Sequence, residues 1–357
     1  MQRNRGAACL VTAVAALALL AAAQQPEPQA PSPEAEIRSA LSQFSAHYDM
    51  IAAKMGSDQA LNLQERLYTD LGWMPDEPPA PGYTPAEWQN RITMEAHLDA
   101  SIVSQAAAGR SAPVTATPGL SEHLVLSRVD GMLAPYALYV PANYAADPRL
   151  VVLLHGNPQT ESALLGSRFF RDLADSTGTI IVAPYGRGIY DFAPPGGDEV
   201  YQVTDEIANA FHIPSDRVYL AGYSMGGFSV FKIGRLHPDR WRSVMAIAGA
   251  ALGSEIDQVR LAFQHKQLFV VTGTADESIP TMYPQNTAFY LSGAGIATGL
   301  YIQRGGTHFI PTLWPMLQEA WHDMIAGRIR ASAYPRGVAS MRDTEPVGSD
   351  VPPGMRP

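Results

Sequence analysis

Apolar residues in the first third of the chain recur at intervals of three and four positions, as at Ile37, Leu41, Phe44, Tyr48 and Ile51. This spacing predicts α-helices. One helix carries these residues, a second covers about 58–71, and a third runs to about 108 from Thr84-Pro85-Ala86-Glu87, which offers an N-cap, a proline at N1 and an acid at N3. We therefore predict an α-helical N-terminal region over residues 34–112. Its plain interpretation is a packing or dimerising appendage, and the alternative is a cap that shapes a substrate site.

From residue 118 onward the pattern changes to alternation and to short apolar runs. Residues 122–129 and 134–140 alternate around Asp130-Gly131, which predicts a β-hairpin. Unbroken runs typical of buried strands follow at 150–154, 179–183, 217–221, 243–248, 268–272 and 300–303. Helical patterns fall between them at 161–176, 200–211, 225–237, 282–294 and 313–325. This alternation predicts an α/β fold over residues 118–330, with a mostly parallel sheet covered by helices on both faces.

The two ends of the chain differ from this core. Arg3 and Arg5 precede an uncharged apolar run over residues 7–23 that ends in Ala21-Ala22-Ala23, so residues 1–23 are predicted to be a signal peptide. A membrane anchor is the alternative, although the run is short for a bilayer span of about 20 residues. Residues 24–33 read as a proline-rich spacer and residues 331–357 as a polar, disordered tail. We expect an exported bacterial protein, periplasmic or secreted, with no membrane span in its mature form.

The composition narrows the choice of function. With 46% hydrophobic and 17% charged residues, the chain is that of an ordinary folded protein. Its formal charge of −9 argues against a nucleic-acid partner. Cys9 is the only cysteine and lies in the predicted signal peptide, which leaves no disulfide, cysteine nucleophile or thiolate metal site. The sequence lacks motifs such as H-E-x-x-H and G-x-x-x-x-G-K-[ST], so we expect no metal and no cofactor.

The most informative segment is 217–227, in which a predicted strand passes through Gly222-Tyr223-Ser224-Met225-Gly226 into a predicted helix. This is the G-x-S-x-G pattern of a nucleophile elbow. Side chains at Gly222 and Gly226 would clash with neighbouring backbone in so sharp a turn, and Ser224 is thereby held at a strained tip beside a helix N-terminus. Ser224 is the predicted nucleophile, with a structural turn as the alternative.

A serine nucleophile needs a base, and the base needs a carboxylate that orients it. His308 follows the last predicted strand on a glycine-rich loop, at the end of the sheet where Ser224 is expected, and is the predicted base. Asp276 comes just past the strand 268–272 and is the predicted carboxylate, with Glu277 as its substitute. The order Ser224, Asp276, His308 favours an α/β-hydrolase over other serine-hydrolase folds. Three other histidines fit structural or surface positions better: His237, His265 and His322.

Acyl transfer also uses two backbone N–H groups that bind the oxyanion. Met225 offers one as the residue after the nucleophile, and we assign the other to Asn157, which follows the apolar strand ending in His155-Gly156. His155 is interpreted as shaping that loop. Arg187, on a later glycine-rich loop, and Tyr223 are candidate substrate-binding residues. A plain surface loop is an equal interpretation for Arg187.

Together these segments resemble the α/β-hydrolase superfamily, and within it the exported esterases of the feruloyl-esterase, acetylxylan-esterase and polyhydroxybutyrate-depolymerase-like group. The resemblance covers about residues 120–327 and implies ester hydrolysis through an acyl-enzyme, with Ser224 as nucleophile, His308 as base and Asp276 as its orienting partner. The helical region has no recognised counterpart in that group. The matching segments are YALYVP (136–141), VVLLHG (151–156), VAPYG (182–186) and IPSDRVYLAGYSMGG (213–227), with Asp276 and His308 after them.

Only about twenty residues separate the predicted strands 243–248 and 268–272, too few for an inserted lid domain. We therefore expect a small-molecule or polymer-borne ester as substrate. Two alternatives stay open at this stage. A serine peptidase related to prolyl oligopeptidase has similar strand and elbow sequences, and a non-catalytic binding protein could use the same fold as a scaffold. The oligomeric state is left open.

Overall fold

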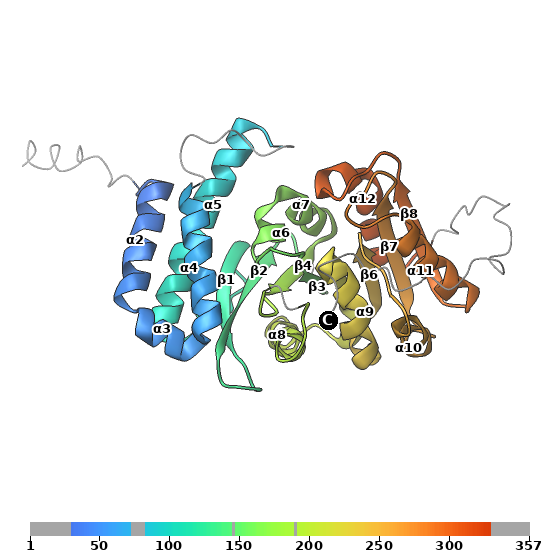
Figure 1. The fold of residues 1–357 in the computed structure, drawn as a ribbon, viewed down its shortest axis with the longest axis horizontal. Helices are drawn as coiled ribbons and strands as arrows, with labels where there is room; N and C mark the ends of the chain where they lie inside the picture. Colours follow the sequence, from blue (N-terminus) through green and yellow to red (C-terminus); the bar gives the residue numbers. More distant parts are fainter. Residues whose placement is uncertain (1–29, 73–82, 145–146, 189–190, 330–357) are drawn as a thin grey trace, which may run out of the picture.

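The computed structural model describes residues 30–72, 83–144, 147–188 and 191–329. The predicted signal peptide, residues 24–29 of the predicted proline-rich spacer and the predicted tail lie outside these residues. The described part forms an eight-stranded sheet with helices on both faces, and a further group of helices lies beside one edge of the sheet (Figure 1).

The sheet is antiparallel at one edge and parallel elsewhere. Its strand order is β1-β2-β4-β3-β5-β6-β7-β8. β1 pairs with β2, and β2 with β4, in antiparallel orientation, and the remaining pairs are parallel. The predicted hairpin and the mostly parallel sheet are therefore confirmed. The strands are Gly119–Leu126 (β1), Leu133–Val140 (β2), Arg149–Leu154 (β3), Thr179–Pro184 (β4), Val218–Tyr223 (β5), Ser243–Ile247 (β6), Gln267–Gly273 (β7) and Ala297–Gln303 (β8).

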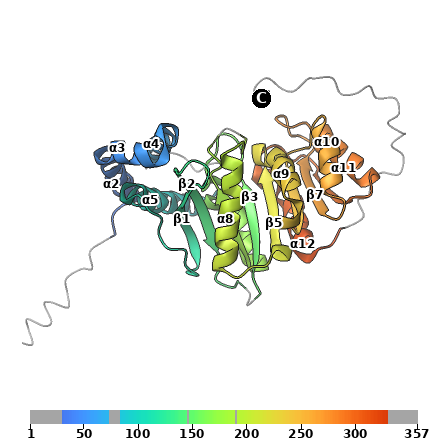
Figure 2. The ribbon, with the colours of Figure 1, turned by 90° about the horizontal axis from the view of Figure 1, so that it is seen from below.

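Each face of the sheet buries its own apolar core, and β3 contributes to both. Leu150, Val152 and Leu154 belong to one core, while Val151 and Leu153 belong to the other, because successive strand side chains point to opposite faces. Helices α8 to α11 cover the first face and α6, α7 and α12 the second (Figure 2). These helices are Ala163–Gly166 (α6), Arg168–Thr177 (α7), Gly196–Ala210 (α8), Met225–Leu236 (α9), Glu255–Ala262 (α10), Met282–Gly293 (α11) and Ile310–Ala326 (α12).

The N-terminal region is helical, as its periodicity predicts. It comprises Pro33–Ala46 (α2), Tyr48–Met55 (α3), Ser57–Gly72 (α4) and Pro85–Ala108 (α5). The predicted start of α5 is confirmed as a capping box, because the Thr84 hydroxyl accepts the Glu87 N–H and the Glu87 carboxylate accepts the Thr84 N–H. The apolar core of this helical region includes Leu124 of β1 and Leu133 of β2, so these helices pack on the edge hairpin.

Several boundaries differ from the prediction, and three of these differences have a clear local reason. The first predicted helix divides at His47, whose N–H is shared between the carbonyls of Gln43 and Phe44 at 3.2 and 3.1 Å, which tightens the turn. The predicted helix 161–176 divides at Ser167, whose hydroxyl caps α7. Strand β1 ends at Leu126, because a hydrogen bond of 2.8 Å from the Ser127 N–H to the Met132 carbonyl closes the turn.

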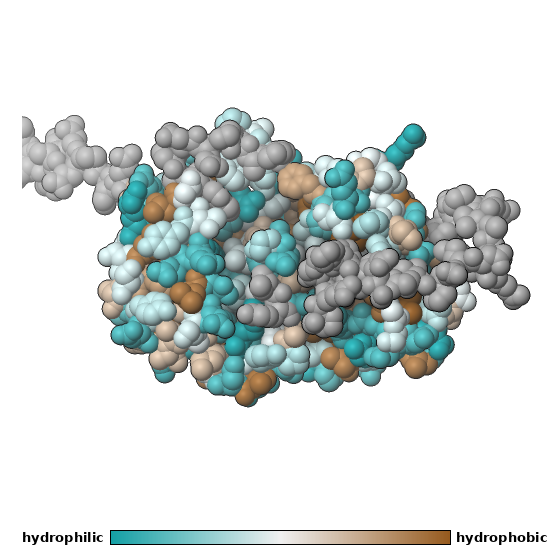
Figure 3. All heavy atoms as spheres, viewed as in Figure 1, coloured by the Kyte–Doolittle hydropathy of each residue, from teal (hydrophilic) through white to brown (hydrophobic). Residues whose placement is uncertain are grey.

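Apolar side chains on the face of the molecule seen in Figure 3 lie singly among polar ones. Within the described ranges, no helix combines the length and the apolar character needed to cross a bilayer.

The junction between the helical region and the sheet contains a buried cluster of charged side chains around Arg66 of α4. The Arg66 Nε lies 2.8 Å from Asp99 Oδ1 of α5, Nη2 lies 3.3 Å from Glu122 Oε1 of β1, and Nη1 lies 2.5 Å from Glu161 Oε1, just before α6. Burial alone would lower the pKa of Arg66, but the surrounding carboxylates hold it well above its ordinary range. This guanidinium therefore stays charged and links four parts of the chain.

Several carboxyl groups surround the single guanidinium of Arg66. This excess of acidic groups favours their protonated forms and raises their pKa values. Burial, together with the nearby Asp99 and Glu95, raises the pKa of Asp70 to about 9 against the opposing effect of Arg66. Burial raises the pKa of Asp99 to about 6 against the opposing effect of Arg66. Protonated carboxyl groups thus reduce the negative charge that the junction has to bury.

We expect Asp70→Asn to flatten the pH dependence of stability. An acid whose pKa rises on folding binds its proton more tightly in the native state, so its contribution to stability is present at low pH. That contribution is lost as pH rises from about 4, the ordinary pKa, toward about 9. Asparagine does not ionise. The free energy of unfolding by urea between pH 5 and 9 should fall less steeply in the variant, by up to about 1.4 kcal/mol per pH unit. Parallel curves for the two proteins would contradict this.

Candidate active site

The turn between β5 and α9 has the strained geometry that the sequence predicts. Ser224 adopts φ 54° and ψ −117°, a conformation that is uncommon for a residue with a side chain. A Cβ at Gly222 would lie 2.2 Å from the carbonyl oxygen of Gly226, and one at Gly226 would lie 2.3 Å from that of Leu154. Both glycines are therefore required by close backbone contact, and they leave Ser224 alone at the tip of the turn.

Three predicted residues from separate loops meet at this tip. Ser224 Oγ lies 2.9 Å from His308 Nε2, and His308 Nδ1 lies 2.9 Å from Asp276 Oδ2. Ser224 follows β5, Asp276 follows β7 and His308 follows β8, and these strands belong to the parallel part of the sheet, so they end at the same edge. A hydroxyl linked through imidazole to a carboxylate is an arrangement suited to nucleophilic attack.

Asp276 is held rigidly and away from solvent. Its side chain is fully buried, and its Oδ1 accepts the N–H groups of Ser278 and Ile279 at 3.0 and 2.8 Å. The other oxygen is then directed at His308. Glu277, the substitute considered from sequence, is exposed. Of the other histidines, His237 is exposed and packs its ring edge against Tyr201, and His265 is exposed.

The loop after β3 approaches the serine closely through Gly156. A Cβ on Gly156 would lie 3.1 Å from Ser224 Cβ. The loop is closed on itself, because the Gly156 N–H donates to Gln159 Oε1 and the Gln159 N–H donates to the Gly156 carbonyl, both at 2.9 Å. Asn157 lies at the exposed turn of this loop, and Met225 is the first residue of α9, where a backbone N–H has no acceptor within its helix. The two predicted oxyanion residues thus lie on the segments that flank Ser224.

His155 lies beneath this loop, as its predicted loop-shaping role requires. It is fully buried, with Nδ1 at 2.8 Å from the Gly156 carbonyl oxygen and Nε2 at 2.8 Å from that of Tyr185. Its ring also packs against Phe192, with the ring centroids 5.2 Å apart. His155 therefore joins the loop after β3 to the loop after β4.

The guanidinium of Arg187, a candidate substrate contact, is bound by carboxylates of the protein itself. Its Nε donates to both oxygens of Glu199 at 2.9 and 3.0 Å, and its Nη1 lies 3.1 Å from Asp130 Oδ2. Glu199 is itself almost fully buried in α8. These contacts fasten the β1–β2 turn to the start of α8, which gives the Arg187 side chain structural partners.

Tyr223, the other candidate substrate contact, touches the site in a way that sequence reasoning did not foresee. Its hydroxyl donates to the backbone carbonyl of His308 at 2.6 Å, and the two rings lie 5.2 Å apart. Its ring also lies beside Gly156. Burial raises the pKa of Tyr223 well above its ordinary range, so its hydroxyl stays protonated and remains a donor. The only signal for this contact in the sequence is the presence of a residue with a hydroxyl group directly before Ser224.

The described residues include no group of three or more His, Cys, Asp or Glu side chains arranged to hold a metal ion.

Comparison with known proteins identifies relatives over part of the chain. No protein-family model matches it. A bifunctional acetylxylan esterase/xylanase, XynS20E of Neocallimastix patriciarum, is 33% identical over 98 residues, which is 26% of this chain and 15% of that protein. Acetylxylan esterase A of Emericella nidulans is 24% identical over 130 residues, which is 33% of this chain and 43% of that protein. The chain thus spans less than half the length of each of these curated relatives.

A solved structure of a ferulic acid esterase superimposes with a TM-score of 0.50 at 16% identity, covering 58% of this chain and 98% of that one. This likeness shows the α/β-hydrolase fold and confirms the predicted fold class. The two acetylxylan esterases confirm the predicted resemblance to the esterase group of that superfamily.

We expect Tyr223→Phe to slow the reaction of Ser224 with a fluorophosphonate probe by about 5-fold, since one hydrogen bond is worth about 1 kcal/mol. The rate should fall because the His308 carbonyl loses the hydrogen bond donated by the Tyr223 hydroxyl, whereas the packing of the two rings is kept. Labelling rates measured by gel fluorescence would check this. Tyr219→Phe, in the same strand, is the matched control and should label at the wild-type rate. Equal rates in all three proteins would mean that the Tyr223 hydroxyl does not help to hold His308.

Proposed function

We propose that this protein is a serine carboxylesterase that hydrolyses carboxylic esters through an acyl-enzyme on Ser224. The observation that carries the proposal is the hydrogen-bonded chain from Ser224 Oγ through His308 to the buried Asp276, with both distances at 2.9 Å. The similarity to acetylxylan esterases supports ester bonds as the target.

In the proposed first half-reaction, His308 Nε2 accepts the proton of the Ser224 hydroxyl as Oγ attacks the ester carbonyl carbon. The carbonyl oxygen becomes an oxyanion. When the tetrahedral intermediate collapses, His308 passes its proton to the departing alcohol and the acyl group stays on Ser224. Asp276 remains ionised throughout, since it keeps the Nδ1 proton of His308 in place and stabilises the imidazolium.

In the proposed second half-reaction, water replaces the alcohol. His308 takes a proton from the water as its oxygen attacks the acyl carbon, and the same proton returns to Ser224 when the carboxylic acid leaves. The same base therefore serves both steps.

We assign the oxyanion to the backbone N–H groups of Met225 and Asn157. The loop that carries Asn157 is fixed by its internal bonds between Gly156 and Gln159 and by the buried His155 beneath it. Donors held before the reaction need no reorganisation in the transition state, and one such donor is worth about 10²- to 10³-fold in rate. This pre-organisation supports acyl transfer over a merely structural serine.

The proposed substrate is a small-molecule or polymer-borne ester. Between β6, which ends at Ile247, and β7, which begins at Gln267, the chain forms only the short helix α10 and its connections. An inserted lid domain at this position would need more residues. The names of the relatives favour acetyl esters borne by xylan. We further propose that the protein is exported, as its N-terminal sequence predicts.

Hydrolysis of p-nitrophenyl acetate, butyrate and octanoate, and of methyl ferulate, by residues 24–357 tests the proposal. We expect turnover by the wild type, and Ser224→Ala should reduce kcat by at least about 10⁴-fold, since it removes the nucleophile. The preferred chain length would then give the size of the acyl pocket. Ester turnover that is unchanged in Ser224→Ala would refute the proposal.

Two further measurements separate the alternatives. Faster cleavage of aminoacyl-nitroanilides than of nitrophenyl esters would favour a serine peptidase. Failure of Ser224 to react with a fluorophosphonate, together with absence of turnover, would favour a non-catalytic binding protein.

A further inference from the structure

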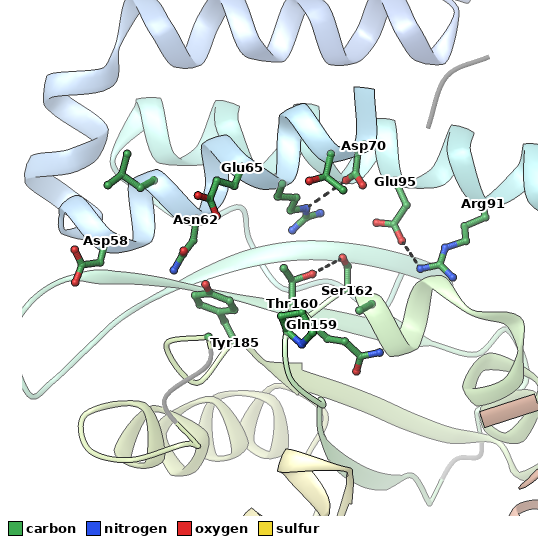
Figure 4. A pocket seen from close by; sticks show the side chains of 16 residues that line it. Asp58, Asn62, Glu65, Asp70, Arg91, Glu95, Gln159, Thr160, Ser162 and Tyr185 are labelled. Atoms are coloured by element: carbon green, nitrogen blue, oxygen red, sulfur yellow. Dashed lines mark hydrogen bonds and ion pairs between the residues drawn. The ribbon is translucent and has the colours of Figure 1, made fainter. Parts of the chain in front are cut away.

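A cavity of about 730 Å³ lies between the helical region and the loop that follows β3 (Figure 4). One wall is α4, with Asn62 and Asp70 among its residues. The opposite wall is the loop itself, represented by Pro158, Gln159 and Thr160. Pro158 is two residues from Gly156, which touches Ser224, so cavity and nucleophile are at most about 7 Å of extended chain apart along this loop. The helical region therefore reaches close to the proposed active site.

Because the cavity separates them, α4 does not pack directly against the middle of this loop. The two are joined instead by an ion pair at the edge of the cavity, in which Arg66 Nη1 of α4 lies 2.5 Å from Glu161 Oε1. The Glu161 side chain is 2% exposed and that of Arg66 is 6% exposed. Glu161 is two residues after Gln159, whose side chain accepts the Gly156 N–H. The ion pair thus holds the end of the loop that bears Asn157.

Arg66 is suited to hold this loop in one position. A guanidinium presents its donors in a rigid plane, and the short contact of its Nε with Asp99 on α5, at 2.8 Å, fixes that plane, whereas the contact with Glu122 on β1 is longer, at 3.3 Å. Both side chains of the pair are buried, so the attraction is screened less than it would be between exposed side chains. Movement of Glu161 away from Arg66 would leave a buried carboxylate without its cation, which is costly.

We propose that Arg66 is a positioning residue for the oxyanion site. Through Glu161, it fixes the loop 156–162 and so keeps the Asn157 N–H where the oxyanion forms. The inference rests on the proposed function for its catalytic consequence, but the immobilisation of the loop is a separate property. It gives the helical region a role in the active site that differs from both sequence interpretations, a packing or dimerising appendage and a cap that shapes a substrate site.

The test compares Glu161→Ala with Glu122→Ala. Each variant removes one buried carboxylate from Arg66, and only Glu161 lies on the loop. With p-nitrophenyl acetate, we expect Glu161→Ala to lower kcat by about 10- to 100-fold with KM within about 3-fold, because oxyanion binding is specific to the transition state. Glu122→Ala should keep kcat within about 3-fold of the wild type. Glu161→Gln, which keeps an acceptor for Arg66, should restore most of the rate and serves if the alanine variant does not fold.

Hydrogen–deuterium exchange gives a second measurement that does not depend on activity. We expect the amides of Gly156, Asn157, Gln159 and Thr160 to exchange at least about 10-fold faster in Glu161→Ala than in either the wild type or Glu122→Ala. Unchanged exchange and unchanged kcat in Glu161→Ala would overturn the inference, and so would equal losses in both alanine variants. If the wild type proves to have no serine-dependent esterase activity, the proposed function fails, and the exchange data still decide whether Arg66 holds the loop.

Discussion

Close contact between backbone segments at the carboxyl ends of the central strands is the constraint on which the site depends. A Cβ at Gly222 would meet Gly226, and one at Gly273 would meet Gly306, each at 2.2 Å from a carbonyl oxygen. The first contact forms the turn of Ser224. The second sets the loop of His308 directly beside the end of β7, where an Ala275 N–H also donates to the Gly306 carbonyl at 2.8 Å. The side-chain hydrogen bonds of the site are consequences of these backbone positions, since larger residues would separate the loops by more than a hydrogen bond spans.

The helical region is attached by two kinds of contact with different consequences. Apolar residues of its helices pack with Leu124 and Leu133 on the edge hairpin, and this burial supplies most of the attraction. Burial is not directional, so it does not by itself fix how the helices sit. The contacts of Arg66 with carboxylates on three other elements are directional, and they fix the orientation. The desolvation of so many acids opposes folding, and the raised pKa of Asp70 shows how protonation offsets part of this cost.

The sequence predicts those features that follow from periodicity or from chain topology. Strands and helices are legible because their apolar periods differ. The meeting of Ser224, Asp276 and His308 is predictable because parallel strands present their carboxyl ends at one edge of the sheet. Contacts that depend on side-chain direction have no such pattern. Arg66 and Glu161 are separated by 95 positions, and neither belongs to a motif.

The same distinction explains the two candidate substrate residues. Its glycine-rich loop near the active end made Arg187 a candidate ligand contact, with a plain surface loop as an equal interpretation. In the structure its guanidinium donates to Glu199 on the next helix. Tyr223 lies within the recognised motif, but the motif specifies only the glycines and the serine, so it does not reveal the contact of the hydroxyl with the His308 carbonyl.

The loop after β3 is held both by the sheet and by the helical region, and these two sets of contacts have different effects. From the sheet side, Gly156 abuts Ser224 and His155 fills the space below, which determines where the loop N–H groups can lie. From the helical side, Glu161 is held by Arg66, which limits how far they can move. An oxyanion gains most from donors that do not have to be ordered as it forms, because ordering a segment in the transition state adds to the barrier. A loop anchored only from the sheet side would have its N–H groups in the right place, but they would still be free to move. The α/β-hydrolase core therefore accounts for the position of the proposed oxyanion site, and the added helices account for its rigidity.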